Sequence, residues 1–103
     1  MATIQADFDS YKYWCYSGHP YEAMVYCYKA TAYVGRIVFF RDGSAIPPNA
    51  NLSGPSIHFP VSRFAEIADT LRFEKPLYLF LNLDNLMGSV GTADFEPVGE
   101  EEG

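Results

Sequence analysis

Two cysteines and two histidines are the side chains of this sequence best suited to nucleophilic or metal chemistry. They are Cys15, His19, Cys27 and His58. Either cysteine, paired with the histidine that follows it, would supply a thiol and a base, and all four together would supply a zinc ligand set. Such zinc ligands usually come as two closely spaced pairs, whereas three, seven and thirty residues separate these four in turn. The sequence therefore predicts no metal, no cofactor and two reduced, unreactive cysteines.

His58 stands between Ile57 and Phe59 in a stretch with strand character. If those two neighbours face the core, His58 points outward beside Ser56 or lines a second buried face. No nucleophile motif surrounds it, so we interpret it as a hydrogen-bonded structural histidine and favour a protein that is not an enzyme. An enzyme that uses His58 with a loop carboxylate stays an alternative. The candidate carboxylates are Asp7, Asp9, Asp84 and Asp94.

Aromatic side chains are concentrated near the N-terminus. Seven of the eight tyrosines and the only tryptophan, Trp14, lie between Tyr11 and Tyr33. Tyr26 and Tyr28 alternate along an expected strand, so their rings would stand on one face and could stack bases of single-stranded nucleic acid. Such binding also requires many cations, and those nearby are Lys12, Lys29, Arg36 and Arg41. Core filling and protein interfaces are therefore the preferred interpretation of the rings.

The elements that must position these side chains are mostly strands. Period-two alternation and aromatic or β-branched content predict strands over 11–16, 24–29, 33–40, 56–59 and 77–83. Asp42-Gly43 predicts a tight hairpin turn where two strands meet. Prolines predict a surface loop over 46–55, and the segment 88–91, Gly-Ser-Val-Gly, is interpreted as a turn or bulge because it opens no helix.

One amphipathic helix is expected over 61–72. Apolar residues recur there at intervals of three and four, and polar residues occupy the other face. Pro60 suits a first turn, and Pro76 requires the helix to have ended. The sequence therefore predicts an α+β fold, with an antiparallel sheet of about five or six strands and one helix on one face. The predicted order is strands, helix, then one or two strands.

The centre of this sheet is expected to be apolar on both faces. In 36–40, Ile37 and Phe39 would point to one face and Val38 and Phe40 to the other, and in 77–83 the leucines alternate with Tyr78 and Phe80. A helix of about 12 residues covers roughly two strands on one face only. The second face then needs another cover, either a layer made by the N-terminal Tyr/Trp segment or a second copy of the chain. We favour a homodimer, because large exposed apolar patches are rare on monomers.

Length and charge indicate one domain with a tail. The 103 residues are 49% apolar and 19% charged, which is typical of a single globular unit. Residues 94–103 contain five acids and no base, so they hold five of the six net negative charges. We expect an α+β domain over 1–93 and an acidic, flexible tail over 94–103. No signal peptide or membrane-spanning apolar run is evident, which predicts a cytoplasmic protein.

Two short motifs resemble a group of small bacterial proteins of uncharacterised function. These motifs are Leu71-Arg-Phe-Glu-Lys-Pro76 and Glu96-Pro-Val-Gly-Glu100, and a Gly-x-Ile-x-Phe strand begins at Gly35. The resemblance covers about residues 33 to 100. It implies a bacterial origin and carries over no functional residue.

Taken together, these patterns predict a small, non-catalytic binding or interaction module that acts as a homo-oligomer through its second, aromatic and apolar sheet face. Its partner would be another protein or a small apolar ligand, without a membrane. The expected binding residues are Trp14, Tyr26, Tyr28, Arg36 and His58. Single-stranded nucleic-acid binding on a sheet that is similar to whirly or PUR domains in architecture stays the first alternative. The enzyme that uses His58 stays the second.

Overall fold

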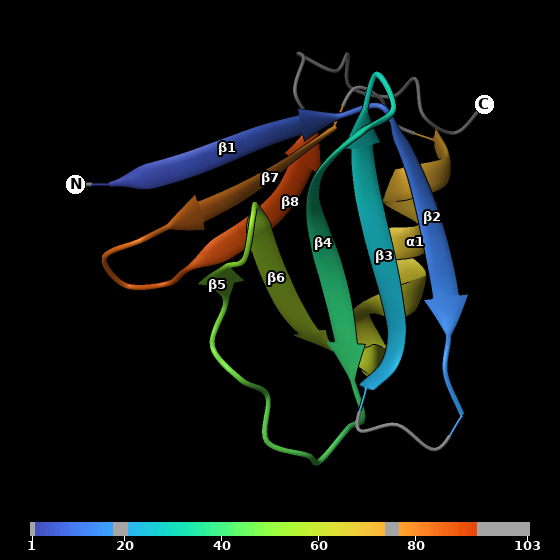
Figure 1. Ribbon diagram of the computed structural model, residues 1–103. Helices are drawn as coiled ribbons and strands as arrows, with labels where there is room; N and C mark the ends of the chain where they lie inside the picture. Colours follow the sequence, from blue (N-terminus) through green and yellow to red (C-terminus); the bar gives the residue numbers. More distant parts are fainter. Residues whose placement is uncertain (1, 18–20, 74–76, 93–103) are drawn as a thin grey trace, which may run out of the picture.

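A computed structural model describes residues 2–17, 21–73 and 77–92 (Figure 1), and it shows two β-sheets and one short helix. One sheet has three strands in the order β1-β7-β8, and the other has five in the order β2-β3-β4-β6-β5. The strands are β1 (Thr3–Phe8), β2 (Ser10–Cys15), β3 (Tyr21–Lys29), β4 (Ala32–Phe40), β5 (Ala50–Asn51), β6 (Pro55–Pro60), β7 (Leu77–Asn82) and β8 (Gly88–Thr92). The predicted α+β class, with mostly antiparallel strands and one helix, is confirmed.

A tight two-residue hairpin turn links β3 and β4, and Asp42-Gly43 is not a hairpin turn. Ala30 and Thr31 make that turn with φ of 51° and 70°, the positive values that a tight hairpin turn requires. Neither is a Gly or Asn, so the sequence carries no turn signal there. Asp42-Gly43 instead begins the loop to β5, and it joins no hairpin because β4 and β6 are parallel.

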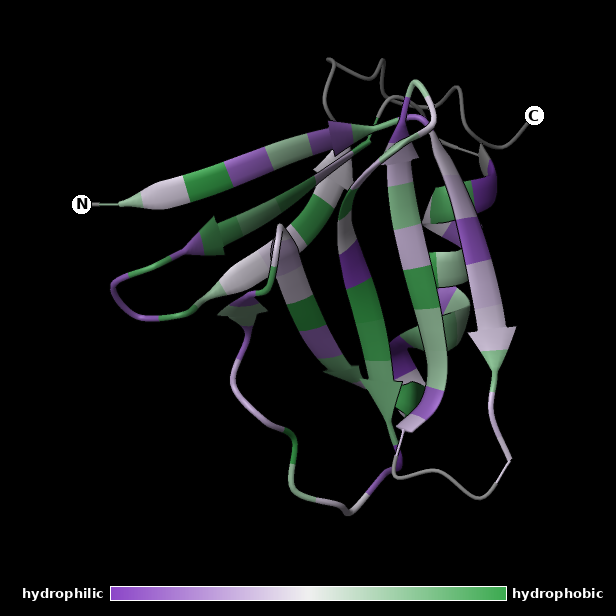
Figure 2. Cartoon of the chain, viewed as in Figure 1, coloured by the Kyte–Doolittle hydropathy of each residue, from purple (hydrophilic) through white to green (hydrophobic). Residues whose placement is uncertain are grey.

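The three-stranded sheet was not expected as a separate unit. β1 carries hydrophobic and hydrophilic residues in strict alternation (Figure 2) and pairs antiparallel with β7. β8, which the sequence analysis interpreted as a turn or bulge, pairs with the other edge of β7. Gly88 is required there by packing, because a Cβ atom at that position would lie 2.6 Å from Cδ1 of Ile57 in the other sheet. The glycine marks a contact between sheets and not a turn.

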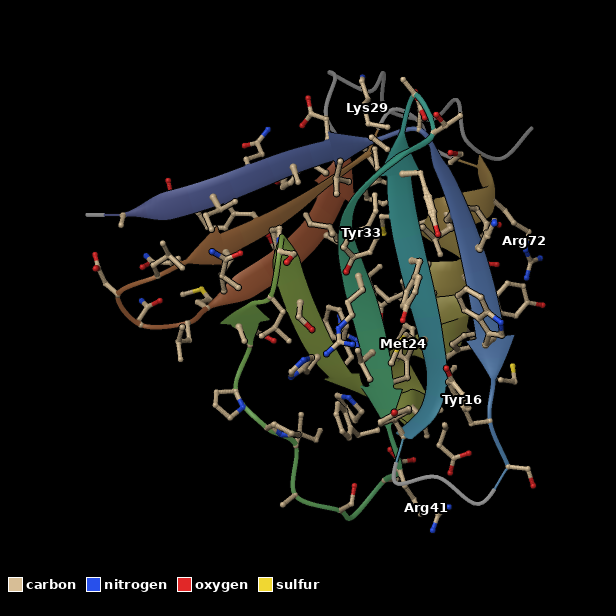
Figure 3. The ribbon with its side chains drawn as sticks, in the orientation of Figure 1. Tyr16, Met24, Lys29, Tyr33, Arg41 and Arg72 are labelled. Carbon is tan, nitrogen blue, oxygen red and sulfur yellow. The ribbon has the colours of Figure 1, made fainter. Side chains whose placement is uncertain are left out.

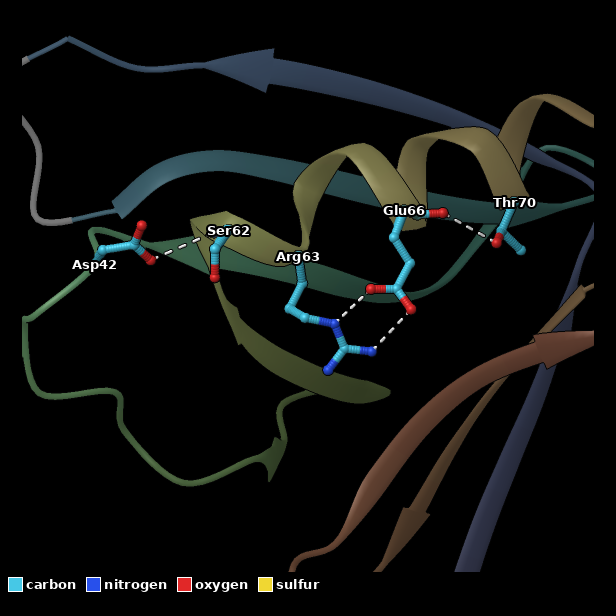
Figure 4. A network of polar contacts seen from close by, with 5 residues as sticks. All are labelled: Asp42, Ser62, Arg63, Glu66 and Thr70. Atoms are coloured by element: carbon cyan, nitrogen blue, oxygen red, sulfur yellow. Dashed lines mark hydrogen bonds and ion pairs between the residues drawn. The ribbon is translucent and has the colours of Figure 1, made fainter.

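The predicted helix over 61–72 is present as a 3-10 turn, η1 (Val61–Arg63), that continues into α1 (Phe64–Phe73). Asp42 accepts a hydrogen bond from the backbone N–H of Ser62 at 3.3 Å, which satisfies a donor at the helix start (Figure 4). The exposed Arg63 guanidinium donates two hydrogen bonds to the Glu66 carboxylate one turn later, at 2.6 and 3.2 Å. These contacts order the first turn of the helix.

The main core lies between the five-stranded sheet, α1 and the three-stranded sheet. It is entirely apolar, and its buried members are Phe8, Ala23, Val25, Cys27, Ile37, Phe39, Ile57, Ile67, Leu77, Leu79 and Leu81. Gly35 allows the two sheets to approach, because a Cβ atom there would lie 2.6 Å from Cδ1 of Leu79 in the three-stranded sheet. We call the face of the five-stranded sheet that lies on this core the inner face.

The opposite face of the same sheet carries a second, smaller apolar cluster of Met24, Val38 and Phe40. The N-terminal Tyr/Trp segment forms no separate layer over this cluster, because β2 is the edge strand of the same sheet. The predicted tail over 94–103 and His19 both lie outside the described residues. Within the described ranges, no helix is long and apolar enough to span a bilayer.

Candidate functional site

The five predicted binding residues share the face of the five-stranded sheet that points away from α1. Cross-strand pairing places Tyr26 opposite Arg36, and it places Val38 opposite His58. Side chains opposite one another in neighbouring strands lie on the same face. We call this surface the outer face, and its members are Lys12, Trp14, Met24, Tyr26, Tyr28, Tyr33, Arg36, Val38, Phe40, Ser56 and His58. Figure 3 views the sheet from this side, with Met24 and Tyr33 labelled.

One half of the outer face is a row of aromatic rings over β2, β3 and β4. Trp14 contacts Tyr26 with ring centroids 4.9 Å apart, and Tyr26 contacts Tyr33 at 5.5 Å, both edge to face. Lys12 Nζ lies 5.7 Å from the centroid of the Tyr28 ring. Burial raises the pKa of Tyr33, and the positive charge of Arg36 opposes that rise. The aromatic row is therefore within the electrostatic reach of Arg36.

The other half of the outer face contains a chain of hydrogen bonds that runs from Arg36 through Ser56 and His58 to Pro47. Arg36 Nε donates to Ser56 Oγ at 2.8 Å, and Ser56 Oγ lies 2.8 Å from His58 Nε2. His58 Nδ1 lies 2.9 Å from the carbonyl oxygen of Pro47, which can only accept. The arrangement that satisfies every partner therefore puts the proton of a neutral His58 on Nδ1, and the Ser56 hydroxyl then donates to Nε2.

Asn49 holds the loop between β4 and β5 against both sheets. Its Oδ1 accepts the backbone N–H of His58 at 2.7 Å, and its Nδ2 donates to the Leu86 carbonyl oxygen at 3.0 Å. Leu86 lies between β7 and β8, so a single side chain joins the loop to β6 and to the three-stranded sheet. The loop is thereby positioned beside the outer face.

Between this loop and the outer face lies a partly open hollow of about 640 Å³. The cluster of Met24, Val38 and Phe40 lines it from the sheet. Tyr21, Arg36 and His58 also line it from the sheet. The loop contributes Ser44, Ala45, Pro47 and Pro48, and Ala50 and Leu52 line the hollow from β5 and the residue after it. The second apolar face predicted from the sequence thus borders a space that the described residues leave unfilled.

The Ser56 and His58 pair has the spacing of a nucleophile and a base, but its surroundings do not suit catalysis. Ser56 is 0% exposed, and its oxygen already accepts from Arg36, so a substrate carbonyl has no access to it. The contacts of His58 are with Ser56, Pro47, Asn49 and Phe40, and no described carboxylate is among them. The arrangement is that of a structural hydrogen-bond chain.

The Cys27 and His58 pair considered from the sequence is not assembled, and the Cys15 and His19 pair includes a residue outside the described ranges. Cys27 is buried in the inner-face core and His58 lies on the outer face, so the sheet separates them. Burial raises the pKa of Cys27 to about 12, which keeps the thiol protonated at neutral pH. Cys15 is exposed, and both cysteines are free. Among the described residues, no three His, Cys, Asp or Glu side chains lie close enough together to bind a metal ion.

Sequence reasoning missed the residues that complete the site from the loop. Period-two alternation places Ser56 beside His58, but nothing local indicates that Pro47 and Asn49 fold back onto β6. The proline content predicted a surface loop without predicting which face it borders. The pairing of β4 with β6, which brings Arg36 to Ser56, is also a non-local contact.

No protein-family model matches this chain, and no curated protein or solved structure matches it. The resemblance to small bacterial proteins stays a prediction. Part of its first motif and all of its C-terminal motif also fall on residues that the structure does not describe.

Proposed function

We propose that this protein is a non-catalytic binding module that takes a small, mainly apolar ligand into the hollow beside its outer face. The observation that carries the proposal is the hollow itself, about 640 Å³ in volume and lined mostly by apolar side chains. Ligand sites typically enclose about 300 to 1,000 Å³ and combine apolar walls with a few polar groups. The hollow has this size and this composition.

The walls of the hollow are held in place before any ligand binds. Met24 and Val38 are 4% and 1% exposed and belong to a paired sheet. The loop side carries Pro47 and Pro48, whose rings restrict the backbone, and Asn49 fixes its position by two hydrogen bonds. Such preorganisation reduces the entropy lost on binding, so it favours a ligand site over a surface that must first be ordered.

The test places a large side chain into the hollow by a substitution in the loop, which leaves the core unchanged. Ala45 is exposed and lines the hollow, and Ala65 is equally exposed on the helix. The neutral fluorescent probe phenylnaphthylamine should bind the wild type, and Ala45→Trp should weaken that binding at least tenfold, about 1.4 kcal/mol. Ala65→Trp is the matched control and should bind like the wild type. Equal binding by all three proteins would overturn the proposal.

A homodimer through the aromatic half of the outer face is the second candidate. Trp14 and Tyr33 are 42% and 39% exposed there, and exposed aromatic rings favour protein interfaces. Light scattering over a range of protein concentrations should show a dimer that Trp14→Ser dissociates. A monomer at every concentration would contradict this candidate and leave the ligand proposal intact.

Single-stranded nucleic acid is a weaker candidate for the same rings. Trp14, Tyr26 and Tyr33 contact one another edge to face, which engages surfaces that bases would need. The cations that the outer face contributes are Lys12 and Arg36. Salt-sensitive binding of an oligonucleotide, weakened by Tyr26→Ala, would favour this function over the other two.

A further inference from the structure

We infer that the ligand of the hollow is an organic anion, a small molecule with an apolar body and one carboxylate or sulfonate-like group, and that Arg36 binds this group. The inference rests on the proposed function and names the chemical class of the ligand. It is carried by the charge of Arg36, by the orientation of its guanidinium, and by the apolar surface beside it.

Arg36 is a half-buried cation whose partners in the structure are neutral. It donates to Ser56 Oγ, and its Nη1 lies 4.0 Å from Met24 Sδ. No carboxylate of the described residues pairs with it. Two other arginines of the described residues do have carboxylate partners: Arg63 pairs with Glu66, and Arg41 pairs with Glu22. A partly desolvated charge without a counter-ion is costly, so an anion that enters the hollow gains a favourable partner there.

The guanidinium is oriented by the residues behind it. The bond from Nε to Ser56 and the contact of Nη1 with Met24 fix its plane, and the remaining N–H donors have no partner among the described residues. Ser56 is itself held by His58, which is held by Pro47. Ser56 and His58 are therefore positioning residues, and they leave free the paired donors that arginine uses to bind a carboxylate or sulfonate.

The body of the ligand would lie against the apolar part of the hollow. Phe40 comes from the strand that also carries Arg36, and Pro47 and Pro48 line the hollow from the loop. The Phe40 and His58 rings contact each other at 5.4 Å, which extends the aromatic surface beside the polar chain. One anionic end with an apolar or aromatic body matches this division of the lining.

Two fluorescent probes with the same ring system test the inference. Anilinonaphthalenesulfonate carries a sulfonate, and phenylnaphthylamine has the same rings without it. The sulfonate probe should bind the wild type more tightly than the neutral probe. Arg36→Met should weaken the sulfonate probe at least tenfold and leave the neutral probe within about twofold, because the substitution keeps an unbranched apolar stem and removes the charged guanidinium. Arg36→Lys should retain part of the preference.

The matched control is Arg72→Met, which makes the same charge change on α1, beside a smaller niche of about 70 Å³ between the helix and the sheet. It should leave both probes unchanged. A loss of sulfonate binding with Arg72→Met in place of Arg36→Met, or equal weakening of both probes by Arg36→Met, would overturn the inference. If the neutral probe binds and is blocked by Ala45→Trp, yet the wild type shows no preference for the sulfonate, the hollow is a ligand site and only the anion assignment fails.

A measurement on the wild type alone covers the case in which Arg36→Met does not fold. Octanoate and octanamide have the same alkyl chain and differ in charge at the polar end. Octanoate should displace bound phenylnaphthylamine at a concentration at least tenfold lower than octanamide does. Displacement by both at the same concentration would contradict a role for Arg36 in binding an anion.

Discussion

The inner and outer faces of the five-stranded sheet are built from alternate residues of the same strands, yet they differ in what covers them. The inner face meets α1 and the three-stranded sheet, and its core cluster contains only apolar side chains. The outer face meets a loop, and its apolar cluster lies beside Arg36, Ser56 and His58. Between the helix and the sheet there is a niche of only about 70 Å³, whereas the loop leaves a hollow of about 640 Å³. We conclude that the closely packed core is concentrated on the inner face, and we propose that binding takes place on the outer face.

Neighbouring phenylalanines on opposite faces give the strongest test of this difference. Phe39 is 0% exposed, and its ring contacts Phe59 and Phe64 at 6.0 and 5.0 Å. Phe39→Ala should cost about 3 to 5 kcal/mol of unfolding free energy, measured by urea denaturation, because it leaves a closed cavity. Phe40→Ala should cost clearly less, since it enlarges a hollow that is already open. Equal losses would remove the distinction between the faces.

A methyl group added where the two sheets meet should have the next largest effect. Gly35→Ala would place Cβ 2.6 Å from Cδ1 of the buried Leu79 in the other sheet, and 2.8 Å from the backbone oxygen of Pro55 in the neighbouring strand, and it should cost about 1 to 3 kcal/mol. Gly91→Ala is the control, because its Cβ would lie 3.1 Å from the Tyr78 hydroxyl, the movable end of a side chain. Thermal unfolding should show a larger fall for Gly35→Ala. The reverse order would mean that the sheets are not closely packed at Gly35.

The buried thiol of the inner face predicts a loss of stability in alkali. Burial raises the pKa of Cys27 to about 12 from the ordinary 9.0. The unfolded chain therefore ionises first, so the contribution of Cys27 is complete below pH 9.0 and is lost as the pH rises toward 12. The unfolding free energy, measured by urea denaturation, should fall by about 1 kcal/mol per pH unit across this interval. The difference in unfolding free energy between the wild type and Cys27→Ala separates the effect of this thiol from that of the tyrosines. A difference that does not change with pH would show that Cys27 is not protected by burial.

The exposed surface of the helix belongs to neither face and should give the smallest effect. The hydrogen bond and charge of Arg63 lower the pKa of Glu66, so any contribution of the pair would be present at neutral pH and lost in acid. Because both side chains are largely exposed, Glu66→Gln should leave the thermal midpoint unchanged within error. A clear fall in the midpoint that salt abolishes would show that surface charge contributes to the stability of α1.

Local patterns were sufficient for some of these elements and not for others. The helix followed from its apolar periodicity and the flanking prolines, and the sharing of one face by Tyr26 and Tyr28 followed from strand alternation. The turn at Ala30 and Thr31 was missed because it adopts positive φ without glycine. The division into two sheets and the parallel pairing of β4 with β6 depend on contacts between distant segments. Those contacts also assemble the chain from Arg36 to Pro47, which explains why the site could be predicted only in part.

The amide of Asn49 links the mouth of the hollow to the far sheet. Its two hydrogen bonds join the loop to the His58 backbone and to the carbonyl of Leu86. The segment around Leu86 exposes Leu83, Leu86 and Met87 at its surface. One side chain therefore connects the loop that borders the hollow to an exposed apolar segment between β7 and β8.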